Sequence, residues 1–276
     1  MTLLHVADIP AEGGYRGTLV ALPGIMESAN TLLHTARHWA SRGFRVLAID
    51  PRGHGASPRW TEDLLRRHPG DVIVEDILAT LQQVLTGADK RLVLFGHSAG
   101  GAAAAAVAAE HPEGVAAVVL EDPFWRLPVT QFQDRKVAVA ASAALRRLKS
   151  MSAAERIAEI AALCPQWPPD ELPAWSQAKD DMDLALVEDG DIIPTRGWPN
   201  LLRDLAEADI PVLVVTGTVR IGITADHRAI IRSLGGEVAV VRGASHFIRR
   251  DARDVFHDLV DDFLDRRILP AVREEP

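Results

Sequence analysis

Short apolar runs alternate with amphipathic stretches along most of the chain. The apolar runs are four to six residues long and rich in Val, Ile, Leu and Ala, which is typical of strands buried on both faces of a sheet. Two further short runs near the start, 2–7 and 11–16, are expected to form an edge hairpin. The runs that predict buried strands are 17–22, 44–49, 91–95, 115–120, 211–215 and 238–241.

Helices are predicted between these runs, where apolar residues recur every three or four positions or where alanines follow one another. Buried strands that alternate with such helices indicate an α/β fold, with helices on both faces of a mostly parallel sheet. The predicted helices span 29–42, 71–86, 102–109, 224–234 and 251–266.

The alternation stops after the sixth predicted strand, 115–120, and resumes near residue 200. The intervening segment contains helical patterns at 134–149 and 152–163, several prolines and four of the six tryptophans, but no pattern of a buried strand. We therefore expect a core formed by 1–123 and 200–276, and a helical cap formed by 124–199. Such an insertion would lie over the carboxyl ends of the strands, where open α/β sheets bind ligands.

Composition and charge narrow the function classes. The chain of 276 residues has 30 Lys and Arg against 38 Asp and Glu, a formal net charge of −8, and no basic block that would favour nucleic acid. The single cysteine, Cys164, cannot form an internal disulfide and fits a reducing compartment. Neither a signal peptide nor a membrane-spanning run is evident. The sequence thus favours a cytoplasmic protein that acts on a small molecule, and it leaves a homodimer open.

A candidate nucleophile lies between the predicted strand 91–95 and the alanine-rich helix. Gly96-His97-Ser98-Ala99-Gly100 matches the G-x-S-x-G nucleophile elbow, in which a sharp turn raises the serine above the sheet. A serine hydroxyl needs a general base, an acid that orients the base, and an oxyanion site. His246 is the favoured base because it follows the last predicted strand, whereas His54 and His97 are weaker candidates within turn motifs.

Five segments follow one another in an order typical of a known family: Leu22-Pro23-Gly24-Ile25, Asp50-Pro51-Arg52-Gly53-His54-Gly55-Ala56-Ser57, Gly96 to Gly100, Leu120-Glu121-Asp122-Pro123 and Gly243-Ala244-Ser245-His246. Together they resemble the motifs of an α/β-hydrolase of the lid-bearing, epoxide-hydrolase-like branch, which includes esterases and lactonases. The resemblance covers nearly the whole chain outside 124–199. It implies that the backbone N–H groups of Ile25 and Ala99 form the oxyanion hole, although Pro23-Gly24 stands where most relatives have His-Gly. It also implies that Asp50 and Arg52 hold a loop and are not catalytic.

The acid of the triad departs from the usual pattern of these relatives. Most of them carry the acid shortly after the seventh predicted strand, which is 211–215 here, but the following segment 216–222 contains no carboxylate. Asp122, at the end of the sixth predicted strand, is the favoured acid, as in a minority of the superfamily. Asp226 and Glu121 remain alternatives.

A serine nucleophile favours acyl transfer to water over the alkyl-enzyme chemistry of epoxide hydrolases and dehalogenases. The expected substrate is a small apolar or aromatic carboxylic ester or lactone, and no metal or cofactor is expected. Carbon–carbon bond hydrolysis and perhydrolysis use the same triad and stay open, as does a ligand-binding protein of this fold without turnover. The residues expected to line the substrate site are Gly24, Met26, Phe124, Trp125, Phe132, Trp175 and Phe247; the cap's aromatic side chains fit equally well in a core of its own.

Overall fold

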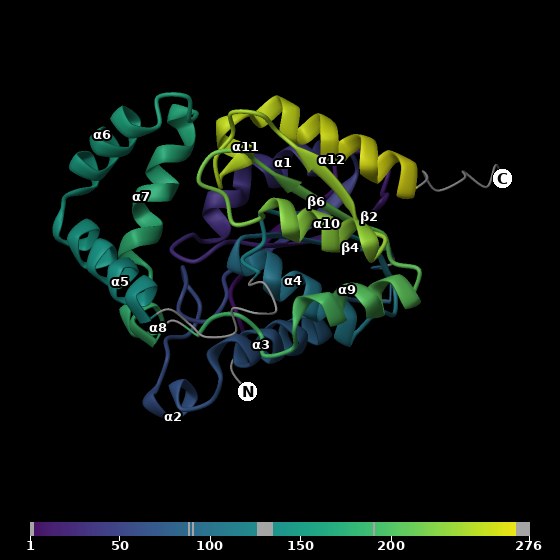
Figure 1. The fold of residues 1–276 in the computed structure, drawn as a ribbon, viewed down its shortest axis with the longest axis horizontal. Helices are drawn as coiled ribbons and strands as arrows, with labels where there is room; N and C mark the ends of the chain where they lie inside the picture. The colour runs from purple at the N-terminus through teal and green to yellow at the C-terminus, as the bar shows by residue number, and fades with distance from the viewer. Residues whose placement is uncertain (1–2, 88, 90, 126–134, 190, 269–276) are drawn as a thin grey trace.

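The computed structural model describes residues 3–87, 89, 91–125, 135–189 and 191–268. Within them a seven-stranded sheet forms the centre of the molecule, in the order β1-β3-β2-β4-β5-β6-β7 (Figure 1). β1 pairs antiparallel with β3, and every other neighbouring pair is parallel. The strands are β1 Val6–Ile9, β2 Gly17–Leu22, β3 Phe44–Ile49, β4 Leu92–His97, β5 Val115–Glu121, β6 Val212–Thr216 and β7 Glu237–Val240.

Helices cover both faces of this sheet, as predicted (Figure 1). Successive residues of a strand point to opposite faces, so Val20 and Leu22 join one core, while Leu19 and Ala21 join the other. α3, α4, α9 and α10 lie on the first side, and α1 and α12 lie on the second. Their bounds are α1 Leu33–Ser41, α3 Pro69–Val84, α4 Ala99–Glu110, α9 Trp198–Glu207, α10 Ala225–Ser233 and α12 Arg253–Arg267.

The alanine run explains the position of α4 in the middle of the first layer. Ala102 to Ala108 are all buried, because the helix is covered by the sheet on one side and by α3 and α9 on the others. A helix that is apolar all round is stable only when it is enclosed in this way. Its small side chains allow close approach to β4, and so fix the start of α4 directly above the end of that strand.

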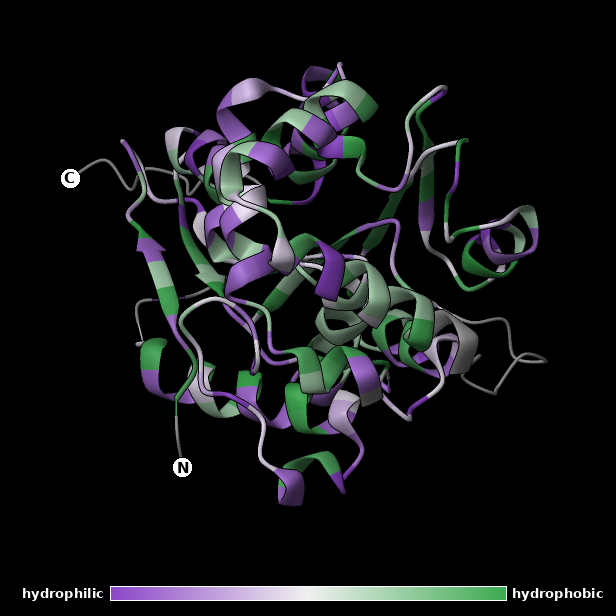
Figure 2. Ribbon diagram, turned by 90° about the vertical axis from the view of Figure 1, so that its left-hand side faces the viewer, coloured by the Kyte–Doolittle hydropathy of each residue, from purple (hydrophilic) through white to green (hydrophobic). Residues whose placement is uncertain are grey.

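Between β5 and α9, four helices of the described residues form a separate group at one side of the sheet (Figure 1). Ile160, Trp167, Leu172 and Trp175 pack there into a small core of their own. Figure 2, which faces this side, shows hydrophilic and hydrophobic residues mixed along the helices. The elements are α5 Arg135–Ser150, α6 Ala153–Leu163, the 3-10 turn η2 Pro169–Glu171, α7 Leu172–Asp180 and α8 Leu184–Asp189.

One sequence prediction about the sheet is wrong. Residues 11–16 form no strand, and β1 is a single edge strand, so the helical segment follows the fifth strand of the described sheet and not a sixth. The chain bends at Gly13, which has φ of 77°. The N–H groups of Glu12 and Arg16 then donate to the carbonyls of Ala40 (2.8 Å) and Gly43 (2.8 Å). Bonds to the turn after α1 thus replace those of a hairpin.

Four short elements complete the description: the 3-10 turn η1 Ala29–Leu32, α2 Glu62–Leu65, α11 Ile248–Asp251 and the loop that joins β3 to α2. None of the helices in the described part of the chain combines the length and apolar character needed to cross a membrane.

Candidate active site

Ser98 occupies a strained turn between β4 and α4. Its φ of 54° and ψ of −118° lie outside the regions that residues with a side chain normally adopt, which costs roughly 1–3 kcal/mol. Glycine is required on both sides: a Cβ at Gly96 would lie 2.2 Å from the Gly100 carbonyl oxygen, and one at Gly100 would lie 2.4 Å from that of Leu22. The turn therefore has the geometry that the nucleophile-elbow motif predicts.

His246 and Asp122 are in direct contact, although 124 positions separate them in the chain. Nδ1 of His246 lies 2.5 Å from Oδ2 of Asp122, and the carboxylate is completely buried whereas the imidazole is 26% exposed. Three further donors bind the carboxylate: Thr216 Oγ1 (2.6 Å), Gly222 N–H (2.8 Å) and Ile223 N–H (3.2 Å). Asp122 is thus held by the segment after β6 in which most relatives carry the acid.

The contacts of Asp122 determine its charge. Burial by itself would raise the pKa of this carboxyl, but His246, the Gly222 N–H and the Thr216 hydroxyl lower it more, so that the pKa lies below its ordinary value. Asp122 is consequently an anion at neutral pH and accepts every hydrogen bond directed at it. A buried anion that faces one imidazole nitrogen fixes the orientation of the ring.

The other candidate acids have different surroundings. Both carboxylate oxygens of Glu121 bind Arg249, one at its backbone N–H (2.8 Å) and one at its guanidinium (2.6 Å). Asp226 is exposed in the first turn of α10. The structure brings only Asp122, of these three, into contact with His246.

His97 directly precedes Ser98 and contacts the loop that carries His246. Its ring lies 4.7 Å from that of His246, measured between centroids, and its Nε2–H donates to the His246 carbonyl (3.0 Å). Nδ1 of His97 lies 2.6 Å from Oε2 of Glu27. Because His97 immediately precedes Ser98, these contacts place the His246 loop beside the elbow. Both nitrogens of His97 are engaged, so this residue is poorly suited to act as the general base.

A buried network of charged groups lies directly under the site, and the sequence analysis missed it. Arg249 bridges Glu27 (2.5 Å) and Glu121 (2.6 Å), while Arg250 lies 2.9 Å from Glu27 and 3.0 Å from Glu171. All five side chains are at most 4% exposed. They join the loop after β2, the end of β5, the helix α11 that follows His246, and the turn η2 that precedes α7. In the sequence such residues look like surface charges, and only their closeness to the motifs is a signal.

The loop after β2 supplies a candidate oxyanion site. A Cβ at Gly24 would lie 3.2 Å from that of Ser98, so this loop runs against the elbow. The Gly24 N–H donates to Glu27 (3.0 Å), which holds the turn without the His-Gly sequence of most relatives. Among the described residues, the backbone N–H groups of Ile25 and Ala99 have no protein acceptor. Ala99 is the first residue of α4, where free N–H groups favour negative charge.

Four of the residues predicted to line the substrate site lie near Ser98. Gly24 contacts the elbow, as described above, and Met26, two residues further along the same loop, has φ of 63°. The Phe124 N–H donates to the Ser98 carbonyl (2.9 Å). The Phe247 ring lies 5.3 Å from that of His246.

The remaining predicted lining residues pack elsewhere or lie outside the described residues. Trp125 is buried and stacks on Trp198, with centroids 4.9 Å apart. Trp175 packs against Trp167 in the small core of the helical segment. Phe132 is outside the residues that the structure describes. The two tryptophans thus contribute to cores, which was the alternative interpretation of the sequence.

Asp50 and Arg52 hold the loop after β3, as the resemblance implied. The Asp50 carboxylate accepts the N–H groups of Ala29 (2.6 Å) and Ala56 (3.0 Å). Arg52 forms an ion pair with Asp76 on α3 (2.6 Å). Both residues therefore stabilise the loop after β3.

Lys179 is a buried lysine that links α7 to the loop after β2. Its Nζ donates to the Met26 carbonyl (2.6 Å) and lies 4.5 Å from the centroid of the Trp175 ring. The side chain is almost completely enclosed. The contact holds the helical segment against the loop that carries Ile25.

The charge of Lys179 should make stability depend on pH. Burial lowers its pKa to about 7, and Arg250 and Arg156 act in the same direction against the charge of Glu27. Between that value and the ordinary 10.5, the unfolded chain binds a proton that the folded chain does not, so the free energy of unfolding rises with pH. We therefore expect the Tm of the wild type, relative to Lys179→Met, to rise from pH 7 to pH 10 in thermal melts.

The matched control for this prediction is Lys149→Met, which removes a more accessible lysine on α5 that donates to a backbone carbonyl. Equal differences in Tm between wild type and Lys179→Met at both pH values would contradict the assignment.

Comparison with known proteins agrees with the fold and its motifs. The family model described as Serine aminopeptidase, S33 matches residues 13–189, more than half of the chain. A curated relative, a protein of Mycobacterium phage D29 that is provisionally named a non-heme haloperoxidase, is 36% identical over 110 residues. That match covers 40% of this chain and 37% of the relative, so the chain spans well under half of the relative's length.

Solved structures of similar fold cover nearly the whole chain. N-formylmaleamic acid deformylase of Pseudomonas putida has a TM-score of 0.73 at 24% identity, covering 93% of this chain and 95% of that one. An esterase of Exiguobacterium antarcticum has a TM-score of 0.72 at 15% identity, covering 95% of both chains. The enol-lactonase of Burkholderia xenovorans has a TM-score of 0.66 at 21% identity, covering 95% and 96%. With the family match, they show that this chain belongs to the Serine aminopeptidase, S33 family and is a hydrolase of the α/β-hydrolase superfamily.

Proposed function

We propose that this hydrolase cleaves a small apolar or aromatic carboxylic ester or lactone through an acyl-enzyme on Ser98. The observation that carries the proposal is the contact of 2.5 Å between His246 and the fully buried, ionised Asp122. The strained conformation of Ser98 beside that pair supports its role as the nucleophile. The esterase and the enol-lactonase of similar fold support the substrate class.

The proposed reaction has two halves. His246 takes the proton of Ser98, whose oxygen attacks the carbonyl carbon, and Asp122 stabilises the imidazolium. The N–H groups of Ile25 and Ala99 bind the oxyanion, each contributing roughly 3 kcal/mol to the lowering of the barrier. His246 then protonates the leaving alcohol, and water activated by the same imidazole releases the acid from Ser98.

Residues 124–199 act in this proposal as a cap over the site. Support comes from the contacts that join them to the catalytic loops: Lys179 to Met26, Glu171 to Arg250, and Trp167 to Phe247, with ring centroids 5.1 Å apart. Such a cap excludes water while the acyl-enzyme forms.

Trapping the acyl-enzyme tests the proposal. With p-nitrophenyl esters in stopped-flow kinetics, we expect a burst of nitrophenol equal to the enzyme concentration, because acylation releases the alcohol first. A fluorophosphonate probe should label the wild type once, on the tryptic peptide that contains Ser98. Absence of both the burst and the label would contradict a serine hydrolase and favour the binding-protein alternative.

A further inference from the structure

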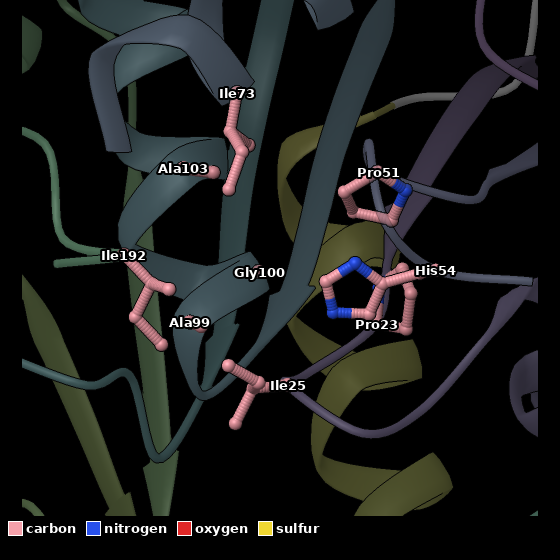
Figure 3. A pocket seen from close by; sticks show the side chains of 9 residues that line it. All are labelled: Pro23, Ile25, Pro51, His54, Ile73, Ala99, Gly100, Ala103 and Ile192. Atoms are coloured by element: carbon pink, nitrogen blue, oxygen red, sulfur yellow. The ribbon is translucent and has the colours of Figure 1, made fainter. Parts of the chain in front are cut away.

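A small cavity lies beside the candidate oxyanion site, between the start of α4, the loops after β2 and β3, and α3 (Figure 3). Its free volume of about 10 Å³ has room for roughly one water molecule. Every lining residue except His54 is a hydrocarbon or a glycine. The lining consists of Pro23, Ile25, Pro51, His54, Ile73, Ala99, Gly100, Ala103 and Ile192.

The order of the strands places this cavity on the side of Ser98 opposite to His246. Ser98 follows β4; the cavity lies at the ends of β2 and β3, whereas His246 follows β7 and Asp122 follows β5. His246 must protonate the leaving group, so the leaving group has to lie on the His246 side. The acyl substituent of the same carbonyl must then point the other way, past Ile25 and Ala99, whose N–H groups would hold the carbonyl oxygen.

The walls of the cavity have little freedom to move. Ile73 projects from α3, Ala103 from α4, and Ile192 from the connection between α8 and α9; all three are buried. His54 Nδ1–H donates to the Arg52 carbonyl (3.1 Å), which fixes the ring that closes another side. Close-packed walls of this kind do not expand without strain.

We propose that this cavity is the acyl pocket and that the enzyme prefers formyl and acetyl esters over longer acyl chains. The inference rests on the proposed function, because it assigns the acyl side of the bond that Ser98 would attack. A pocket with room for one water accepts a hydrogen or a methyl group next to the carbonyl, whereas a propyl group would collide with Ile73 and Ile192.

The acyl-length series tests the wild type directly. We would measure kcat/KM for p-nitrophenyl formate, acetate, propionate, butyrate and hexanoate, each corrected for spontaneous hydrolysis. Since one methylene changes kcat/KM by about 10-fold to 200-fold at a shaped apolar pocket, we expect butyrate to be cleaved at least about 100-fold more slowly than acetate.

Two variants that enlarge the cavity test whether its walls limit the length of the acyl chain. Ile73→Ala and Ile192→Ala should each raise the ratio of butyrate to acetate at least about 10-fold, because each removes a wall. Ile210→Ala is the matched control: all three isoleucines are 6% exposed, but Ile210 lies between α9 and β6, away from the cavity. Ala103→Val, which fills the cavity, should lower activity on acetate more than on formate. Thermal melts would establish that each variant is folded. If only one of the two isoleucine variants folds, that variant alone is enough to test the proposal.

The outcomes separate this inference from the proposed function. If the wild type cleaves butyrate as fast as acetate, or if the folded isoleucine variants keep the wild-type ratio, the cavity is not the acyl pocket, while labelling of Ser98 by a fluorophosphonate leaves the serine hydrolase intact. If no ester is turned over and Ser98 is not labelled, both proposals fall together.

Discussion

Replacing Ser98 by alanine is expected to lower kcat about 10⁵- to 10⁶-fold on any ester that the wild type cleaves. The loss is this large because no acyl-enzyme can form once the hydroxyl is absent. Single-turnover kinetics with the best ester of the acyl series would measure it. Ser98→Ala should retain affinity for a substrate or product, since the loop after β2 and the walls of the cavity are unchanged.

Stability measurements separate this effect from misfolding. Ser233→Ala, at the exposed end of α10 where the hydroxyl binds only its own helix, is the matched control and should keep full activity. Ser98→Gly should abolish activity as well, yet raise Tm above that of Ser98→Ala, because glycine adopts φ of 54° without the penalty of a Cβ. Residual turnover in Ser98→Ala within 10-fold of the wild type would show that another group performs the chemistry.

Asp122→Asn is expected to lower kcat about 10⁴-fold. An amide cannot stabilise the imidazolium of His246, and it favours the wrong tautomer of the ring. Both oxygens of Asp122 accept bonds, Oδ2 from His246 and Gly222, and Oδ1 from Thr216 and Ile223. Whichever way the amide of asparagine is turned, its NH₂ group would face hydrogen-bond donors in place of an acceptor, so Tm should fall too.

The pH dependence of Asp122 has a definite sign. The pKa of Asp122 in the folded protein is lowered, so the carboxylate stabilises the fold above the pKa of an unfolded aspartate, about 3.9. This stabilisation is lost as pH falls through the folded pKa. The difference in Tm between wild type and Asp122→Asn should therefore be constant near neutral pH and shrink in acid.

Asp226→Asn is the matched control for both measurements, because it makes the same change at an exposed carboxylate on α10. We expect it to leave kcat within about two-fold of the wild type. If Asp226→Asn were the damaging change and Asp122→Asn were harmless, the acid would have been assigned to the wrong residue.

Patterns that act over a few residues were sufficient to predict much of this molecule. The positions of the buried strands and their helices followed from apolar spacing, and the turn at Ser98 followed from glycines that a close backbone approach requires. The sequence also favoured Asp122 over Asp226 and Glu121, since parallel strands end side by side and the segment after β6 lacks a carboxylate. The structure brings that aspartate to His246.

Contacts between distant segments could not be predicted in the same way. Residues 11–16 failed to form a strand because their backbone bonds go to the turn after α1. Trp125 and Trp175 had the composition of a binding pocket, but they pack into cores, since a buried indole stabilises either location.

The sequence by itself determined the fold class and the sharp turn at Ser98, because the first depends on local periodicity and the second on glycines at fixed positions. It favoured His246 and Asp122 as the partners of Ser98 through the order of the strands and the resemblance to α/β-hydrolases, and that assignment stays a prediction. Only the tertiary structure decided how the loops that carry them are held together. Glu27 and Arg249 are 222 positions apart, and each would ordinarily be exposed to solvent. Their burial is tolerable only because the folded chain brings opposite charges and hydrogen-bond partners to the same place. No local pattern in the sequence predicts a contact between residues that lie so far apart in the chain.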